Sequence, residues 1–150
     1  MPRHEPVWVL EDSVRIIHTR QISEHGGLAG ARDQGMLESA LGKPKNLYAY
    51  SSRKPSLARL AASYAFGIAK NHPFTDGNKR TALVVCELFL RLNKHTIAAG
   101  HGEKYTTFLA LADGTISEEN FTKWLDEHLV KRPEIGSKSK LKNQSSKRQN

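Results

Sequence analysis

The residue types best suited to catalysis stand together in one short polar stretch, residues 72–80, which reads His-Pro-Phe-Thr-Asp-Gly-Asn-Lys-Arg. His72 carries an imidazole that can act as a general base near neutral pH. Asp76, four residues later, carries a carboxylate, the hard oxygen ligand that suits Mg²⁺. Gly77 lets the backbone approach a ligand closely. A base and a metal ligand therefore stand within one predicted loop.

The residues after Gly77 complete this set with an anion site. Asn78, Lys79 and Arg80 begin the next predicted helix, where unpaired N–H groups and the positive end of the helix dipole favour phosphate. Base, metal ligand and anion site are what phosphoryl transfer requires. We therefore expect the loop to move a phosphate-containing group from a nucleotide to a hydroxyl.

Each of these residues also has a purely structural interpretation. His72 could be a satisfied structural histidine, and Asp76 could merely cap the helix that begins at Asn78. Lys79 and Arg80 could be a solvated helix start. The joint occurrence of all these groups, directly before a strongly apolar helix, favours the chemical interpretation.

Two strong helical patterns flank the loop and must position it. Apolar residues recur at helical spacing over residues 57–71, with Ser56 as a predicted N-cap, and residues 78–92 are apolar on most sides. The second helix is therefore expected to be the buried centre of the domain. The single cysteine, Cys86, lies in it and is interpreted as a core residue rather than a nucleophile.

Weaker patterns predict the remaining elements. A helix with Asp12 or Ser13 as its N-cap is expected after a short apolar lead-in at residues 7–10. Two further helices are predicted over residues 103–112 and 117–129, the latter capped by its first residue, a serine.

Between these regions the sequence predicts mostly irregular structure. A short helix over residues 36–41 is expected to stop at Gly42 and Pro44, followed by a long exposed loop or hairpin over residues 43–55. The predicted class is all-α, a single compact helical domain over residues 1–130 with the active loop between two central helices.

The net charge of +8 is concentrated at the carboxyl end. Seven basic residues and one acid follow Val130, so six of the eight net positive charges lie in residues 131–150. This segment has too few apolar residues to fold, so we expect a disordered tail that binds nucleic acid weakly at most. The single cysteine, and the lack of a signal peptide or membrane span in the sequence, predict a cytoplasmic protein.

Residues 72–80 resemble the signature of the Fic/Doc family, His-x-Phe-x-Asp/Glu-Gly/Ala-Asn-Gly/Lys-x, and match every defined position. Residues 30–41 also resemble the amino-terminal segment of the death-on-curing (Doc) branch. The resemblance implies that His72 is the base for the target hydroxyl, that Asp76 holds Mg²⁺ on the nucleotide phosphates, and that Phe74 anchors the loop. It also implies an anion-binding turn made of Gly77, Asn78, Lys79 and Arg80.

Two positions distinguish the branches of this family. The AMP-transferring members usually have glycine where this chain has Lys79, and a second arginine where it has Leu83. A lysine adds bulk and charge to the anion turn, which is the Doc arrangement, in which the γ-phosphate is presented to the target. Leu83 removes the arginine that pairs with an inhibitory glutamate in many relatives, which leaves control to a separate antitoxin protein.

Three functions follow as alternatives. The resemblance favours a Doc-like toxin of a toxin–antitoxin system that uses ATP with Mg²⁺ to phosphorylate a protein hydroxyl, the implied target being elongation factor Tu. AMP transfer to a protein hydroxyl is the second alternative, and an inactive scaffold or nucleic-acid-binding protein is the third. His72 and Asp76 are intact, which disfavours the inactive form, and the nearly neutral charge of residues 1–130 disfavours nucleic acid as the main partner.

Overall fold

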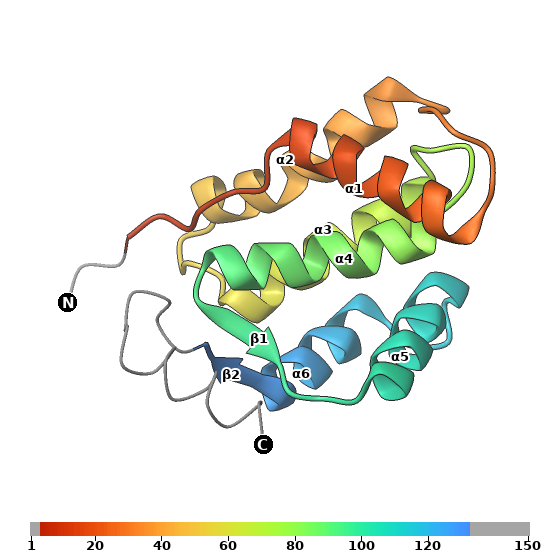
Figure 1. Cartoon of the computed structure of the whole chain (residues 1–150). Coiled ribbons are helices and arrows are strands. Elements are labelled where there is room, and N and C mark those ends of the chain that lie inside the picture. The colour runs from red at the N-terminus through yellow and green to blue at the C-terminus, as the bar shows by residue number, and fades with distance from the viewer. Residues whose placement is uncertain (1–3, 133–150) are drawn as a thin grey trace, which may run out of the picture.

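The computed structural model describes residues 4–132, which form a bundle of helices with a small two-stranded ribbon at one end (Figure 1). The elements in chain order are α1 (Glu11–His25), α2 (Gln34–Tyr50), α3 (Leu57–Asn71), α4 (Asn78–Leu92), β1 (His95–Ile97), α5 (His101–Asp113), α6 (Glu118–His128) and β2 (Leu129–Lys131). The predicted helical class is confirmed, and the predicted active loop lies between α3 and α4. None of the helices in the described part of the chain is long and apolar enough to cross a membrane.

The central helix of the bundle is α3. It contacts α2, α4, α5 and α6, and ten of its fifteen residues are buried, against seven of fifteen in α4. The sequence predicted α4 as the buried centre, whereas the structure gives α3 the more enclosed position. Its predicted N-cap is confirmed, because the Ser56 hydroxyl accepts a hydrogen bond from the Arg59 N–H at 3.1 Å.

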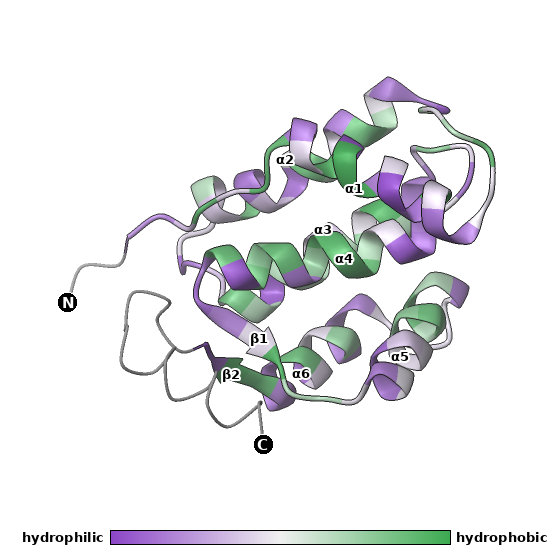
Figure 2. Cartoon of the chain, viewed as in Figure 1, coloured by the Kyte–Doolittle hydropathy of each residue, from purple (hydrophilic) through white to green (hydrophobic). Residues whose placement is uncertain are grey.

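The pair α3 and α4 forms the scaffold of the loop. Hydrophobic residues recur along both helices (Figure 2), and the rings of Tyr64 and Phe89 meet between them at a centroid distance of 5.1 Å. Cys86 is fully buried in this core, as predicted. Burial raises the pKa of the Cys86 thiol, so it is not a nucleophilic thiolate.

The helix α2 is longer than the sequence predicted, and the predicted loop over residues 43–55 is wrong for most of its length. Pro44 lies inside the helix, which continues to Tyr50. The physical reason is burial: Leu37, Ala40, Leu41 and Pro44 form one buried stripe at helical spacing. The packing of this stripe on the core offsets the loss of the backbone hydrogen bond that a proline cannot donate.

The predicted N-cap of α1 is also wrong. The helix begins at Glu11, so Leu10 occupies the N-cap position and no side chain caps the helix end. Two acidic residues, Glu11 and Asp12, lie in the first turn instead. Their negative charges interact favourably with the positive end of the helix dipole.

The carboxyl-terminal helices lie near their predicted positions. The Ser117 hydroxyl accepts a hydrogen bond from the Asn120 N–H at 3.0 Å, which confirms this cap. The final helix ends at His128 because Leu129 enters β2, which pairs antiparallel with β1. The sequence did not predict this ribbon, since three-residue strands are too short for a visible alternation.

The ribbon includes a residue beyond the predicted domain boundary at residue 130. Lys131 pairs with His95 in the ribbon, and the Arg132 N–H donates to the Lys94 carbonyl at 2.8 Å. The remainder of the predicted tail, residues 133–150, lies outside the described residues, so its disorder stays a prediction.

Candidate active site

The loop between α3 and α4 forms one wall of an open cavity of about 540 Å³, within the usual size range of ligand pockets. All the residues that the sequence singled out for chemistry line this cavity, namely His72, Asp76, Gly77, Asn78, Lys79 and Arg80. The remaining lining comes from α1 and the glycines after it, from the loop itself and from α5, namely Gln21, His25, Gly26, Gly27, Thr75 and Tyr105.

The candidate base, His72, ends α3 in an unusual conformation. Its backbone is left-handed, with φ 51° and ψ 56°, and its side chain is exposed to the cavity. The imidazole Nδ1 lies 3.5 Å from the Asn78 amide nitrogen, at the outer limit of a hydrogen bond. The ring is therefore accessible from the cavity.

The side chain of Asn78 holds the loop closed. It is buried, its Oδ1 accepts a hydrogen bond from the Phe74 N–H at 3.0 Å, and its Nδ2 donates to the Phe74 carbonyl at 2.9 Å. Asn78 can therefore offer an anion only its backbone N–H. The first N–H groups of an α-helix have no partner within the helix, and in α4 no side chain caps them.

Gly77 occupies the N-cap position of α4, where both conformation and space require glycine. Its φ is +78°, and a Cβ at this position would lie 3.2 Å from the Ile22 Cδ1 and 3.6 Å from the His18 ring. The tight turn between Asp76 and α4 thus depends on this residue.

The Asp76 carboxylate does not cap α4. The alternative interpretation of Asp76 as a helix cap is therefore wrong. Its Oδ2 accepts a hydrogen bond from the Leu28 N–H at 2.8 Å. Its Oδ1 takes part in no hydrogen bond among the described residues, which leaves it available to a metal ion. Within residues 4–132 no three His, Cys, Asp or Glu side chains form a metal-binding group. Asp76 fits Mg²⁺, since this ion is commonly held by one or two carboxylates together with phosphate oxygens and water.

Both basic residues of the turn are contacted by α5. The Lys79 Nζ lies 3.8 Å from the Asp113 Oδ1, and both side chains are about half exposed, so this ion pair is weak and easily exchanged for a phosphate. The Arg80 guanidinium lies over the Tyr105 ring at 4.9 Å, a cation–π contact. Sequence reasoning missed Tyr105 because the contact joins two separate helices.

A second missed residue, His18, supports the loop from α1. It is buried, and its ring stacks on Phe74 at a centroid distance of 3.8 Å with an interplanar angle of 9°. Its Nε2 donates to the main-chain carbonyl of Asp76 at 2.7 Å, since a carbonyl can only accept. The available signal was its position four residues after Val14, on the buried stripe of α1.

We expect His18→Leu to lower the free energy of unfolding by about 1–3 kcal/mol, because the Asp76 carbonyl loses its donor while the apolar volume is largely kept. Chemical denaturation of both proteins measures the difference. Thr19→Ala, on the exposed side of the same helix, is the matched control and should change stability by less than about 0.5 kcal/mol. Equal stability of His18→Leu and the wild type would contradict the supporting role.

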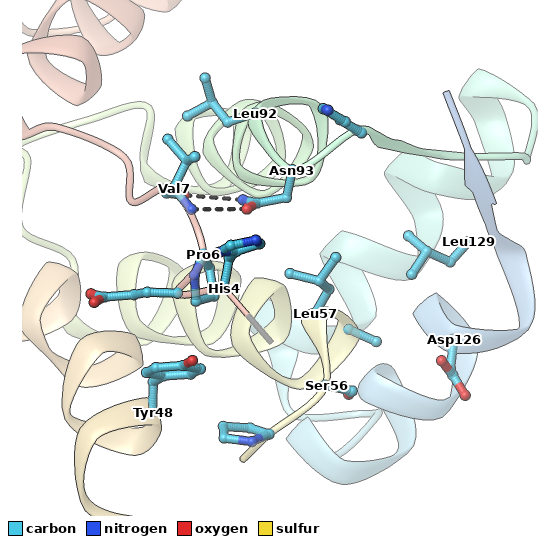
Figure 3. A pocket seen from close by; sticks show the side chains of 14 residues that line it. His4, Pro6, Val7, Tyr48, Ser56, Leu57, Leu92, Asn93, Asp126 and Leu129 are labelled. Atoms are coloured by element: carbon cyan, nitrogen blue, oxygen red, sulfur yellow. Dashed lines mark hydrogen bonds between the residues drawn. The ribbon is translucent and has the colours of Figure 1, made fainter. Parts of the chain in front are cut away.

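A second cavity, of about 550 Å³, lies at the opposite ends of α3 and α4 (Figure 3). Its lining is mainly apolar and includes Leu57, Leu92 and Leu129. Two hydrogen bonds between the Asn93 side chain and the Val7 backbone, at 2.8 and 3.0 Å, tie the amino-terminal segment to its rim. None of the residues of the active loop reaches it, so the first cavity is the candidate active site.

Comparisons with known proteins show the family to which the chain belongs. A family model described as the Fic/DOC family matches residues 8–90, more than half of the chain. The chain is 40% identical over 77 residues to "Protein kinase doc" of Escherichia phage P1. It is 36% identical over 74 residues to "Toxin Doc" of Mycolicibacterium smegmatis.

These alignments are partial on both sides. They cover 51% and 49% of this chain, and 60% and 57% of the two relatives. The chain thus matches less than two thirds of each relative's length. The family match includes α3, the whole active loop and most of α4. This chain belongs to the Fic/Doc family.

Proposed function

We propose that this chain is a Doc-like toxin that transfers the γ-phosphate of ATP to a hydroxyl of a target protein and so blocks translation. One observation carries the proposal: His72, Asp76 and the amino-terminal end of α4 border the same cavity. A general base, a magnesium ligand and an anion site are the groups that phosphoryl transfer needs in one place.

The proposed reaction follows from these positions. The target hydroxyl gives its proton to the His72 imidazole while its oxygen forms a bond to the γ-phosphorus. The bond between the γ-phosphorus and its bridging oxygen breaks, and ADP leaves. The first N–H groups of α4, with Lys79 and Arg80, bind the phosphates of the nucleotide. Asp76 would hold Mg²⁺, which offsets the negative charge of the phosphates.

Transfer of phosphate rather than AMP is supported by Lys79. A glycine at this position leaves space for two phosphates in the anion turn, and the lysine side chain reduces this space and adds a positive charge. The name of the phage relative, a protein kinase, is in line with this choice. AMP transfer is the second candidate, because the rest of the motif is shared with the AMP-transferring members.

The proposal includes two protein partners. The target is elongation factor Tu, by family resemblance, and the reaction runs in the cytoplasm, where ATP and this factor are found. A cognate antitoxin controls the enzyme, since Leu83 stands where many relatives have the arginine that binds an inhibitory glutamate. The name of the mycobacterial relative, a toxin, supports this assignment. Nucleic acid is at most a weak partner of the basic tail.

Labelled ATP tests the proposal. We expect the protein, incubated with elongation factor Tu and Mg²⁺, to transfer label from γ-labelled ATP and none from α-labelled ATP. The intact mass of the target should rise by one phosphate. An AMP-sized increase as the main product would contradict the kinase assignment and establish the second candidate. Absence of both labels, with salt-sensitive retention on DNA, would favour the third alternative, a nucleic-acid-binding protein.

A further inference from the structure

The backbone conformation of His72 requires support from its surroundings. Among the described residues only His72 and Lys94 combine a positive φ with a side chain, and the φ of His72 is 51°. Such a conformation is unfavourable for most non-glycine residues and persists where neighbouring contacts hold it. It also determines the direction in which the imidazole leaves the end of α3.

The Arg32 guanidinium forms hydrogen bonds with the backbone at His72. Its Nε donates to the His72 carbonyl at 2.7 Å, and a terminal nitrogen donates to the Asn71 carbonyl at 2.9 Å. These carbonyls lie at the carboxyl end of α3, where the helix leaves acceptors unpaired and a positive charge is favourable. One planar, charged group therefore joins the last two carbonyls before Pro73.

The backbone around Arg32 holds this contact in place. The N–H groups of Arg32 and Asp33 both donate to the Pro73 carbonyl, at 2.7 and 3.0 Å. Ala31 and Phe74 form an antiparallel bridge next to this pair. The segment before α2 thus lies against the active loop over several residues. These backbone contacts fix the position of the Arg32 main chain relative to the loop.

We propose that Arg32 is a positioning residue, which fixes the His72 imidazole at the angle needed to accept a proton. Among the described residues its side chain donates to backbone carbonyls alone, and it is not part of the cavity lining, so it acts through His72 and not on the nucleotide. This inference rests on the proposed function, in which His72 is the general base.

Arg32→Ala tests the inference through a split between kcat and KM. We expect kcat to fall by about 10- to 100-fold, the loss typical of a misplaced catalytic group, while the KM for ATP stays unchanged because α4 and its N–H groups are intact. Arg32→Lys should recover only part of the loss, since an ammonium lacks the planar fork that reaches both carbonyls. Millimolar guanidinium ion should partly restore kcat of Arg32→Ala. An unchanged kcat, or a loss that lies only in KM, would overturn the proposal.

Asp33→Ala is the matched control for a purely structural effect. The Asp33 side chain caps α2 by accepting from the Met36 N–H at 3.1 Å, and among the described residues it forms no hydrogen bond with His72 or Asn71. We expect this variant to melt at a lower temperature while its kcat stays at the wild-type value. If both variants lost kcat in proportion to their loss of stability, Arg32 would have no specific effect on His72.

A measurement without any substrate separates this inference from the proposed function. The imidazole signals of His72 can be followed by NMR in protein with ¹⁵N-labelled histidine, and assigned by their absence in His72→Gln. We expect Arg32→Ala to shift and broaden the His72 signals while those of the buried His18 stay in place. A wild-type protein that transfers neither label would refute the proposed function only. Identical His72 spectra in the two proteins would refute the positioning role.

Discussion

Replacing His72 with alanine is expected to lower the single-turnover rate of transfer by about 10²- to 10⁴-fold, the usual contribution of a positioned general base. The target hydroxyl then has no imidazole to accept its proton, and the one carboxylate of the loop, Asp76, is assigned to Mg²⁺. The fold should be unaffected, because the imidazole is exposed and its contact to Asn78 is at the limit of a hydrogen bond. Rapid-quench transfer from γ-labelled ATP, together with thermal melting, measures both quantities.

Because the backbone at His72 is left-handed, a second variant is needed to separate loss of the imidazole from backbone strain. Asparagine accepts this conformation more readily than alanine, so His72→Asn removes the base with the least backbone strain. Both variants should lose transfer to a similar extent and melt near the wild-type temperature. A wild-type rate in either one would exclude His72 as the base. Activity in His72→Asn with none in His72→Ala would mean that the backbone conformation matters and the imidazole does not.

The loop residues that line the site could be predicted because they are neighbours in sequence, unlike the lining residues from α1 and α5. Base, carboxylate and helix start follow one another in residues 72–80, so one turn between two helices brings them to one cavity. The flanking helices could be predicted for the same local reason. Their apolar spacing and the Ser56 cap are visible without knowledge of any tertiary contact.

The supports of the site could not be predicted, because they depend on contacts between distant segments. Arg32 reaches His72 across forty residues of sequence, and His18 reaches Asp76 across fifty-eight. Nothing in the local pattern connects them. The error at α2 has a related origin: the rule that proline ends a helix is local, whereas the burial of Pro44 is tertiary.

In the proposed function the Asp76 carboxylate binds two partners, the Leu28 N–H and Mg²⁺. Its Oδ2 accepts from the Leu28 N–H at 2.8 Å, and its Oδ1 is available to Mg²⁺. Its contact with His18 uses the main chain and is independent of the side chain. An asparagine at this position can still accept from Leu28 and lacks the negative charge. The exchange therefore separates metal binding from loop structure.

Asp76→Asn is expected to raise the Mg²⁺ concentration at half-maximal transfer by about tenfold or more, the effect of losing one charge-assisted contact. Its melting temperature should stay close to that of the wild type, because the hydrogen bond from Leu28 persists. Asp76→Ala, which removes that bond as well, is the comparison: it should share the Mg²⁺ defect and melt at a lower temperature. Transfer rates over a Mg²⁺ series and thermal melting of all three proteins measure these effects. If Asp76→Asn kept the wild-type Mg²⁺ requirement, the carboxylate would serve only to hold the loop, and the magnesium ligand would have to be sought elsewhere in the cavity.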